Sequence, residues 1–332
     1  MKWDTKIRRT SGNFIVALLS ILFSLLISEI IFRAMVHLDI IEFPRPSEEV
    51  IHQYSENKEL VYELKPSFPA ETIYSPIKTN KYGLRDYEYS LAKPPNTLRI
   101  CVIGDSMTFG LNLAMEDTYP KILERILNST YGDRRRFEVI NFAVAGYNSS
   151  QEEIVLKEKC LRFSPDMILV GFCLNDDSYA DGLGDLAREI SPYSLGGRLH
   201  SKLISYLLHR YERANFENWN DMGRVERFFE ALSKLKTSDG VEAVILVFPY
   251  YFENLDSYGE TGKHKQVKNI AEKYDLFVID FKDAWSEFDW QTRKSFYLAN
   301  DTGHLSTRGM KDVATRVFGY LQRNMLTDDQ GR

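Results

Sequence analysis

The chain has little cysteine and no excess of positive charge. Its 332 residues include three cysteines, and the formal net charge is −5 at pH 7. The cysteines have no metal-ligand spacing and cannot all pair with one another, so the sequence predicts neither a metal site nor a structural disulfide. The acidic balance leaves no basic footprint for nucleic acid. We therefore expect no metal, no cofactor and no nucleic-acid partner.

The chain also has no glycine-rich phosphate loop after its first predicted strand. That strand, residues 98–103, ends at Gly104, and neither G-x-G-x-x-G nor a Walker-type lysine follows. A nucleotide-binding Rossmann domain needs one of these motifs. An α/β-hydrolase elbow needs Gly-x-Ser-x-Gly, but Thr108 stands where its last glycine would be. Both classes are therefore disfavoured.

One long apolar run lies near the N-terminus. Residues 14–32 supply about the 20 helical residues that a bilayer core needs. The preceding basic residues predict a cytoplasmic N-terminus at 1–12, a transmembrane signal anchor at 13–36 and an extracytoplasmic remainder. A cleaved signal peptide is the alternative, although no small-residue cleavage pattern is obvious. Glu29 precedes Arg33 by four residues, so the two can pair on one helix face.

Alternating strand and helix patterns predict a doubly wound parallel sheet in residues 97–324. The expected strands cover residues 98–103, 137–142, 167–173, 243–248 and 277–281. A helix opened by Ser150, with Glu153 three residues later, fits a capping box. Residues 177–240 form a long helical crossover, in which the polar and aromatic residues 215–220 suggest a lid. Residues 37–96 are predicted to be a connector arm packed on this domain, and 325–332 a tail.

Ser106 and His304 are the candidates for nucleophilic chemistry. Ser106 follows the glycine turn at the carboxyl end of a predicted strand, where ligands bind in open α/β sheets. His304 lies between the last strand and the last helix, and Asp301, three residues earlier, is placed to orient it. Asp280 is a second candidate for that role. The remaining histidines are interpreted as surface residues: His37, His52, His200, His209 and His264.

Three hydrogen-bond donors for an oxyanion fall at successive strand ends. They are the backbone N–H of Ser106, the backbone N–H of Gly146 and the side-chain amide of Asn175. Each alone is explained by a turn or a strand end. Their ordered occurrence on one sheet predicts an acyl-transfer site, because such donors stabilise a tetrahedral oxyanion.

The ordered set resembles the SGNH hydrolase (GDSL esterase/lipase) family. The matching blocks are residues 104–106, 141–146, 171–176 and 301–304. The resemblance implies a flavodoxin-like three-layer α/β/α sandwich and ester hydrolysis without a metal, with Ser106, Gly146, Asn175 and His304 as the four named residues. Two positions depart from the family pattern. Met107 replaces the usual leucine, and three residues rather than one separate Gly171 from Asn175.

These observations predict a membrane-anchored serine esterase with a Ser106–His304–Asp301 triad. Asp105 and Asp176 are expected to bond loop N–H groups around it. The expected substrate is an ester of a small acyl group, most simply O-acetyl, on an envelope polysaccharide, a setting that the resemblance implies for anchored members. The lipid bilayer is the partner of residues 13–36. The alternatives are an O-acyltransferase with the same triad and a non-catalytic, membrane-tethered protein for glycan binding or assembly.

Overall fold

The computed structural model describes residues 2–38, 40, 51–57, 59–60, 62–71, 76–177, 201–204, 206–207 and 221–326. The chain divides into two compact units, residues 1–47 with 183–217 and residues 48–182 with 218–332. The suggested lid at 215–220, His200, His209 and tail residues 327–332 lie outside the described residues. Each unit is described by itself.

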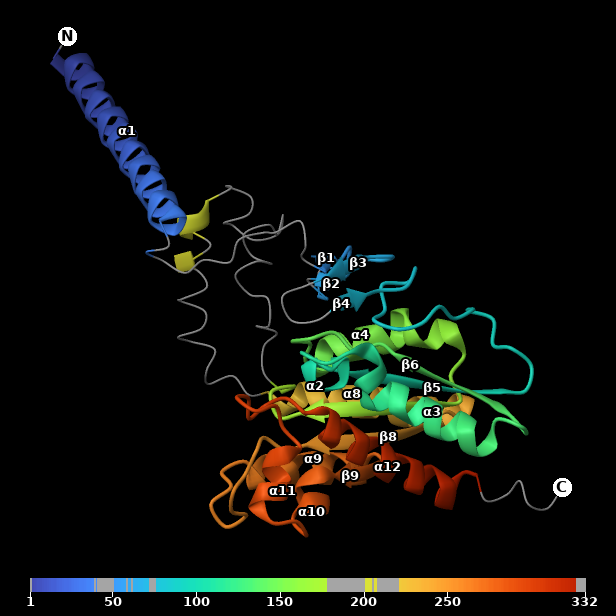
Figure 1. The fold of residues 1–332 in the computed structure, drawn as a ribbon. Coiled ribbons are helices and arrows are strands. Elements are labelled where there is room, and N and C mark those ends of the chain that lie inside the picture. The colour runs from blue at the N-terminus through green and yellow to red at the C-terminus, as the bar shows by residue number, and fades with distance from the viewer. Residues whose placement is uncertain are drawn as a thin grey trace. The chain divides into compact units, whose positions relative to one another are not determined.

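A five-stranded parallel sheet forms the centre of the larger unit (Figure 1). Its strand order is β6-β5-β7-β8-β9. The strands are β5 (Thr97–Gly104), β6 (Arg136–Asn141), β7 (Met167–Cys173), β8 (Glu242–Phe248) and β9 (Phe277–Asp280). All seven residues of β7 are buried, as expected for a central parallel strand covered on both faces. The sheet predicted from the sequence is confirmed, with strand ends shifted by one residue at most.

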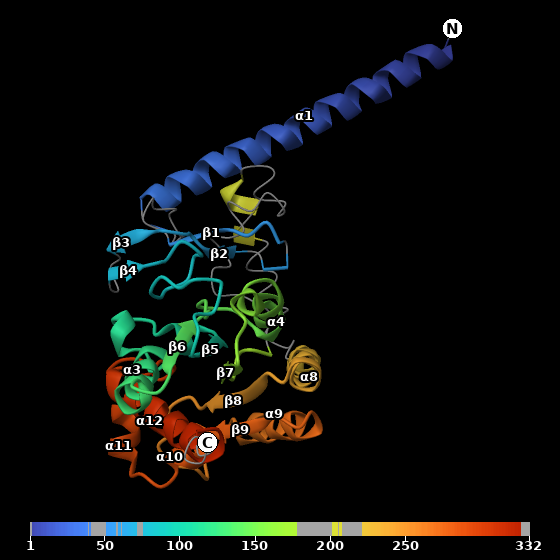
Figure 2. The ribbon, with the colours of Figure 1, turned by 90° about the vertical axis from the view of Figure 1, so that its right-hand side faces the viewer.

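Helices cover both faces of this sheet, which gives three layers (Figure 2). One face carries α3 (Tyr119–Tyr131) and α12 (Thr307–Asn324), and the other carries α4 (Ser149–Glu158), α8 (Met222–Asp239) and α9 (Thr261–Lys273). Short helices complete the unit: α2 (Ser106–Phe109), η1 (Met115–Asp117), η2 (Cys160–Phe163), α10 (Phe281–Trp285) and α11 (Trp290–Ser295). Alternate apolar residues of the strands pack on α3 and α12 in one core. This packing makes the unit an α/β/α sandwich.

The start of α4 differs from the prediction. Its N-cap is Asn148, whose side chain accepts from the N–H groups of Ser150 and Gln151. The Gln151 side chain in turn accepts from the Asn148 N–H, which completes the capping box. The capping box predicted at Ser150 and Glu153 is therefore wrong by two residues. Asn148 and Gln151 serve the same two roles half a turn earlier.

The connector arm folds onto the sandwich through short strands. Strand β1 (His52–Tyr54) pairs antiparallel with β2 (Tyr62–Leu64), and β3 (Pro69–Glu71) with β4 (Pro76–Lys78). A tight turn follows, in which Gly83 has a φ of 72° and the Asn80 side chain accepts from the N–H groups of Tyr82 and Leu84. The turn predicted over 79–86 is thus confirmed, because Asn and Gly supply this geometry at low cost.

The smaller unit is built on the N-terminal helix α1 (Lys2–His37). Its residues Asn13–His37 are long and apolar enough to cross a membrane, and an 18-residue window within them has a mean hydropathy of 2.6. Arg33 Nε donates to Glu29 Oε1 at 2.7 Å, as the spacing predicts. Glu29 also accepts from Ser201 Oγ at 2.7 Å and from the Lys202 N–H at 2.9 Å. The carboxylate thus binds the start of the helical residues 202–204, which is the favoured place for a negative charge.

Candidate active site

Ser106 is the first residue of α2, and one residue separates it from the end of strand β5. Asp105 is the N-cap, and its Oδ1 accepts from the Met107 N–H at 2.9 Å. Two glycines in register, Gly104 at the end of β5 and Gly171 within β7, let α2 lie close to the sheet. A Cβ at either position would lie within 2.3 Å of the Thr108 Oγ1. The absence of a side chain at both glycines therefore allows α2 to hold Ser106 at the edge of the sheet.

The position of β5 in the sheet also favours a site at Ser106. The chain runs from β5 to β6 on one side and then to β7 on the other, so the winding reverses at β5. In open α/β sheets, ligands bind at the carboxyl ends of the strands at such a switch point. Gly146 follows β6 and Asn175 follows β7, so both candidate donors belong to connections that leave the two neighbours of β5.

The structure brings Ser106, His304 and Asp301 into one chain of hydrogen bonds. His304 Nε2 lies 2.9 Å from Ser106 Oγ, and His304 Nδ1 lies 2.5 Å from Asp301 Oδ2. Ser106 and His304 are 198 residues apart in the sequence. The histidine and aspartate side chains retain 24% and 32% of their exposure, so the group is open to solvent.

The turn that carries His304 is held from both ends. The Leu298 N–H donates to the His304 carbonyl at 3.0 Å, and the Tyr251 N–H donates to the Thr302 carbonyl at 2.8 Å. Asp301 Oδ1 accepts from the N–H groups of Gly303 and His304 at 2.7 and 3.2 Å. Burial by itself would raise the pKa of Asp301, but these hydrogen bonds outweigh it and hold the pKa below its ordinary value. Asp301 therefore stays ionised beside the imidazole.

The remaining two oxyanion candidates are held by neighbouring aromatic residues. Gly146 has a φ of 79°, which glycine adopts without strain. The Tyr62 hydroxyl donates to the adjoining Ala145 carbonyl at 2.9 Å. The Tyr250 hydroxyl lies 3.4 Å from Asn175 Oδ1, an orientation that turns the Asn175 NH2 group the other way.

Three carboxyl groups are buried behind this edge: Asp105, Glu152 and Asp176. Asp176 Oδ2 accepts from the Cys173 N–H at 2.6 Å, so Asp105 and Asp176 each bond a backbone N–H next to a strand end. Burial raises the pKa of all three groups, and the Asp105 carboxylate raises that of Glu152 further. Burial thus favours the neutral form of each group, since an unpaired charge at this depth is costly.

Predictions about three other residues were wrong. Asp280, the second candidate for orienting His304, instead lies 2.9 Å from the Nδ1 of His264 through its Oδ1. His264 was predicted to be at the surface, yet it is 1% exposed, because α9 turns that face toward β9. His52 is also largely buried, and burial lowers its pKa to about 4. A pattern around one histidine does not reveal which aspartate approaches it from another element.

The arm supplies residues to this site that the sequence did not indicate. Buried Arg85 donates to the carbonyls of Phe109, Gly110 and Leu113, which surround the end of α2. Its neighbour Asp86 accepts from the Asn141 N–H at 2.7 Å, at the end of β6. The only local sign of this role in the sequence was the pair of charged residues after the Gly83 turn. Such pairs are usually exposed to solvent, so they do not by themselves indicate a buried contact.

The described part of the chain contains no group of three or more His, Cys, Asp or Glu residues arranged to hold a metal ion. Cys101, Cys160 and Cys173 are free and buried. Burial raises the pKa of the Cys160 and Cys173 thiols well above the ordinary value. The group with the geometry of an activated nucleophile is therefore the Ser106 hydroxyl and its histidine.

Comparison with known proteins gives one family and several similar folds. The model of the GDSL-like lipase/acylhydrolase family matches residues 102–311. A lipase/acylhydrolase from Enterococcus faecalis is 14% identical over 68% of this chain and 95% of its own, with a TM-score of 0.47. An acetylxylan esterase from Geobacillus stearothermophilus is 18% identical over 68% of this chain and 93% of its own, with a TM-score of 0.44. No curated protein sequence matches the chain.

The family match extends from within β5 into α12, so it includes Ser106, Gly146, Asn175, Asp301 and His304. It covers well over half of the chain. The arm and α1 precede the matched residues. The chain belongs to the GDSL-like lipase/acylhydrolase family and is a serine hydrolase that acts on ester bonds.

Proposed function

We propose that Ser106, His304 and Asp301 are the catalytic triad of a membrane-anchored esterase that removes small acyl groups from an extracytoplasmic polysaccharide. The observation that carries this proposal is the continuous hydrogen-bond chain from Ser106 Oγ through His304 to Asp301. Such a chain is what a hydroxyl needs to act as a nucleophile at neutral pH.

Acylation begins when Ser106 Oγ attacks the ester carbonyl carbon. His304 Nε2 accepts the hydroxyl proton, and Asp301 stabilises the resulting imidazolium through Nδ1–H. The tetrahedral oxyanion forms with donors from the Ser106 N–H, the Gly146 N–H and the Asn175 side chain. Each such donor contributes about 3 kcal/mol to the transition state. The intermediate then collapses, and His304 gives its proton to the departing alkoxide, so that an alcohol leaves.

Deacylation repeats these steps with water as the nucleophile. His304 removes a proton from the water, which attacks the acyl carbon of the Ser106 ester. The second tetrahedral intermediate releases the acid, and His304 returns the proton to Ser106 Oγ. Asp105 and Asp176 act in both halves as fixed acceptors for backbone N–H groups near Ser106 and Asn175.

Openness of the triad supports a small acyl group on a bulky carrier. The His304 and Asp301 side chains are partly exposed, so an ester on a polymer can reach them without entering a deep cavity. The anchor is argued from the apolar Asn13–His37 helix and the basic residues before it. That charge distribution favours a cytoplasmic N-terminus and a substrate on the other side of the membrane.

Turnover of an aryl acetate by the full chain in detergent tests the triad. Ser106→Ala is expected to lower kcat by about 10⁴-fold or more and to abolish labelling by a fluorophosphonate probe. Ser129→Ala, an exposed serine on α3, serves as the control and keeps both activities. Undiminished turnover in Ser106→Ala would exclude this serine as the nucleophile.

A further inference from the structure

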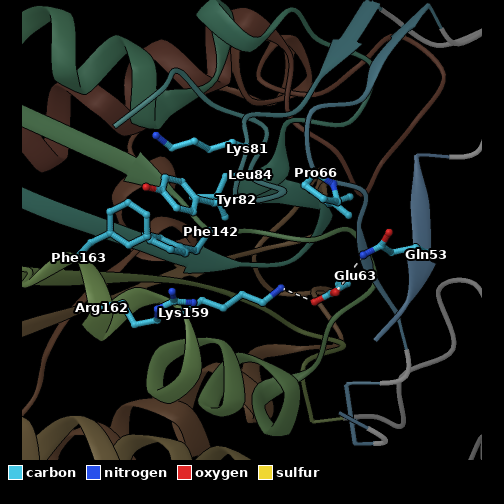
Figure 3. Close-up of a pocket in the computed structure, with 11 residues that line it drawn as sticks. Gln53, Glu63, Pro66, Lys81, Tyr82, Leu84, Phe142, Lys159, Arg162 and Phe163 are labelled. Carbon is cyan, nitrogen blue, oxygen red and sulfur yellow. Dashed lines mark hydrogen bonds and ion pairs between the residues drawn. The ribbon is translucent and has the colours of Figure 1, made fainter. Parts of the chain in front are cut away.

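A pocket of about 250 Å³ opens between the arm and the turn that follows α4 (Figure 3). Its walls come from the β1–β2 hairpin, residues 81–84 and residues 159–163, with Phe142 between them. Neither Ser106 nor His304 lines it, so it is separate from the candidate active site. Its volume is somewhat below that of pockets for drug-sized ligands, which suits one small ring better than an acyl chain.

Positive charge dominates the lining, although the whole chain is acidic. Lys81, Lys159 and Arg162 face one carboxylate, Glu63. Lys159 Nζ is bound to Glu63 Oε2 at 2.7 Å, which neutralises that pair. Lys81 Nζ lies 4.0 Å from the exposed carboxylate of Glu88 and 5.0 Å from the centre of the Tyr82 ring. Among the residues that the structure describes, the exposed Arg162 has no hydrogen-bond or ion-pair partner, so two cations remain for a ligand.

The floor of the pocket is apolar and carries one further polar group. Phe142 and Phe163 are both 2% exposed, and the half-buried Tyr82 ring lies 5.1 Å from that of Phe163. Within the described ranges the Tyr82 hydroxyl makes no hydrogen bond. The pocket therefore offers an apolar surface, a hydroxyl and two cations. A sugar ring that bears a carboxylate presents the complementary set: an apolar C–H face, hydroxyl groups and one negative charge.

We propose that this pocket binds an acidic sugar residue of the polysaccharide substrate, with Arg162 holding the sugar carboxylate and Lys81 adding positive charge. The choice of a glycan as the ligand rests on the proposed function. The choice of an acidic sugar rests on the charge and shape of the pocket. A planar guanidinium binds a carboxylate with two parallel hydrogen bonds, which gives Arg162 the larger share of the affinity.

The pocket and the candidate active site lie on one connection. Phe142 precedes Gly146 by four residues, so their Cα atoms are at most about 14 Å apart. An oligosaccharide bound at the pocket therefore lies within reach of the Gly146 loop. The pocket would select acidic glycans by raising the affinity for the polysaccharide that carries the ester. The triad performs the same chemistry on any small ester.

Direct binding to the full chain in detergent micelles tests this assignment without requiring turnover. The probes are a short oligogalacturonate, a neutral malto-oligosaccharide of the same length and inorganic phosphate. We expect only the oligogalacturonate to bind tightly, with an affinity that falls as salt is added. Arg162→Ala should weaken it by about tenfold, as for the loss of a charged hydrogen bond. Lys157→Ala, two residues before Lys159 and paired with Glu153 outside the pocket, should leave it unchanged.

Four results would overturn the proposal: no oligogalacturonate binding, equal binding of the neutral sugar, equally tight binding of phosphate, or full affinity in Arg162→Ala. The thermal midpoint of each variant shows whether it folds, and Lys81→Ala repeats the test at a second exposed residue. Because the probe carries no ester, failure to bind it says nothing about turnover of an aryl acetate by the triad. A failure of that turnover likewise says nothing about binding of the probe to the pocket.

Discussion

Arg85 provides the sharpest test of how the arm contributes to catalysis. The side chain is 2% exposed, and its Nη1 donates to the carbonyls of Phe109 and Gly110 at 2.6 and 3.0 Å. Its Nη2 donates to the Leu113 carbonyl. The Phe109 and Gly110 carbonyls lie at the end of a helix of four residues that begins with Ser106, and Leu113 follows three residues later. Carbonyls at a helix end have no partner inside the helix, so Arg85 takes that role for α2.

The expected loss follows from these bonds. A hydrogen bond to a charged group contributes about 1.5–3 kcal/mol, and each carbonyl left buried without a partner costs about 1–3 kcal/mol. Burial opposes the charged guanidinium and lowers the pKa of Arg85 to about 10, which offsets part of the gain. Replacing Arg85 by Met should therefore lower the free energy of unfolding by about 3 kcal/mol. A shift of α2 on the order of 1 Å would lower kcat by about 10²-fold in the chains that remain folded.

Arg99 is the matched control. It is also buried and donates to the carbonyls of Leu91, Phe163 and Ser90, but it stands near the amino end of β5, away from Ser106. Arg99 also forms a buried ion pair with Glu138 at 2.6 Å, so its replacement should cost at least as much stability as that of Arg85. Urea denaturation and aryl acetate kinetics on both Met variants separate stability from catalysis. We expect both to lose stability and only Arg85→Met to lose kcat per folded chain. Equal kcat in the two variants would show that Arg85 supports the fold and does not position the nucleophile.

Two further substitutions test the charges around the site. Asp301→Asn places an amide against His304 Nδ1 and favours the wrong imidazole tautomer, so kcat for an aryl acetate should fall by about 10⁴-fold; a fall of less than tenfold would exclude Asp301 as the orienting residue. Glu152 is buried, and among the described residues neither of its oxygens has a partner. Its pKa is raised by burial and by Asp105, so its neutral form supports the folded state at low pH, and this support is lost as pH rises through the folded pKa. Glu152→Gln should therefore be more stabilising at about pH 8 than at about pH 5 in urea denaturation, whereas Glu153→Gln, the partner of Lys157, should show no such difference. An equal effect of Glu152→Gln at both pH values would contradict a raised pKa.

Residues whose partners lie on the same element were predictable from the sequence. The buried strand β7 is an unbroken apolar run, and its bounds agree with the predicted residues 167–173. Asp301 and His304 share one turn, so their spacing indicated a contact that the structure contains at 2.5 Å. Periodicity and short spacings determine such features because the backbone geometry between the residues is fixed.

Contacts between distant segments were not predictable in the same way. His264 has the spacing of a residue on an amphipathic helix, yet the packing of α9 on β9 buries it against Asp280. Arg85 lies before the residues that match the family, and its acceptors are 24 to 28 residues further along the chain. The energy of such a contact depends on whether two surfaces meet, which local propensity does not specify.

The sequence by itself determined where the five strands of the sheet lie along the chain, the serine after the first of them and the Asp-x-x-His turn near the end. These follow from local periodicity, from glycine at the strand ends and from residues three apart. The tertiary structure alone decided that Asp280 pairs with His264, and that Arg85 of the arm supports the end of the helix that begins with Ser106. The parallel sheet brings residues 106 and 304 to one edge, because the carboxyl ends of all its strands lie on the same side.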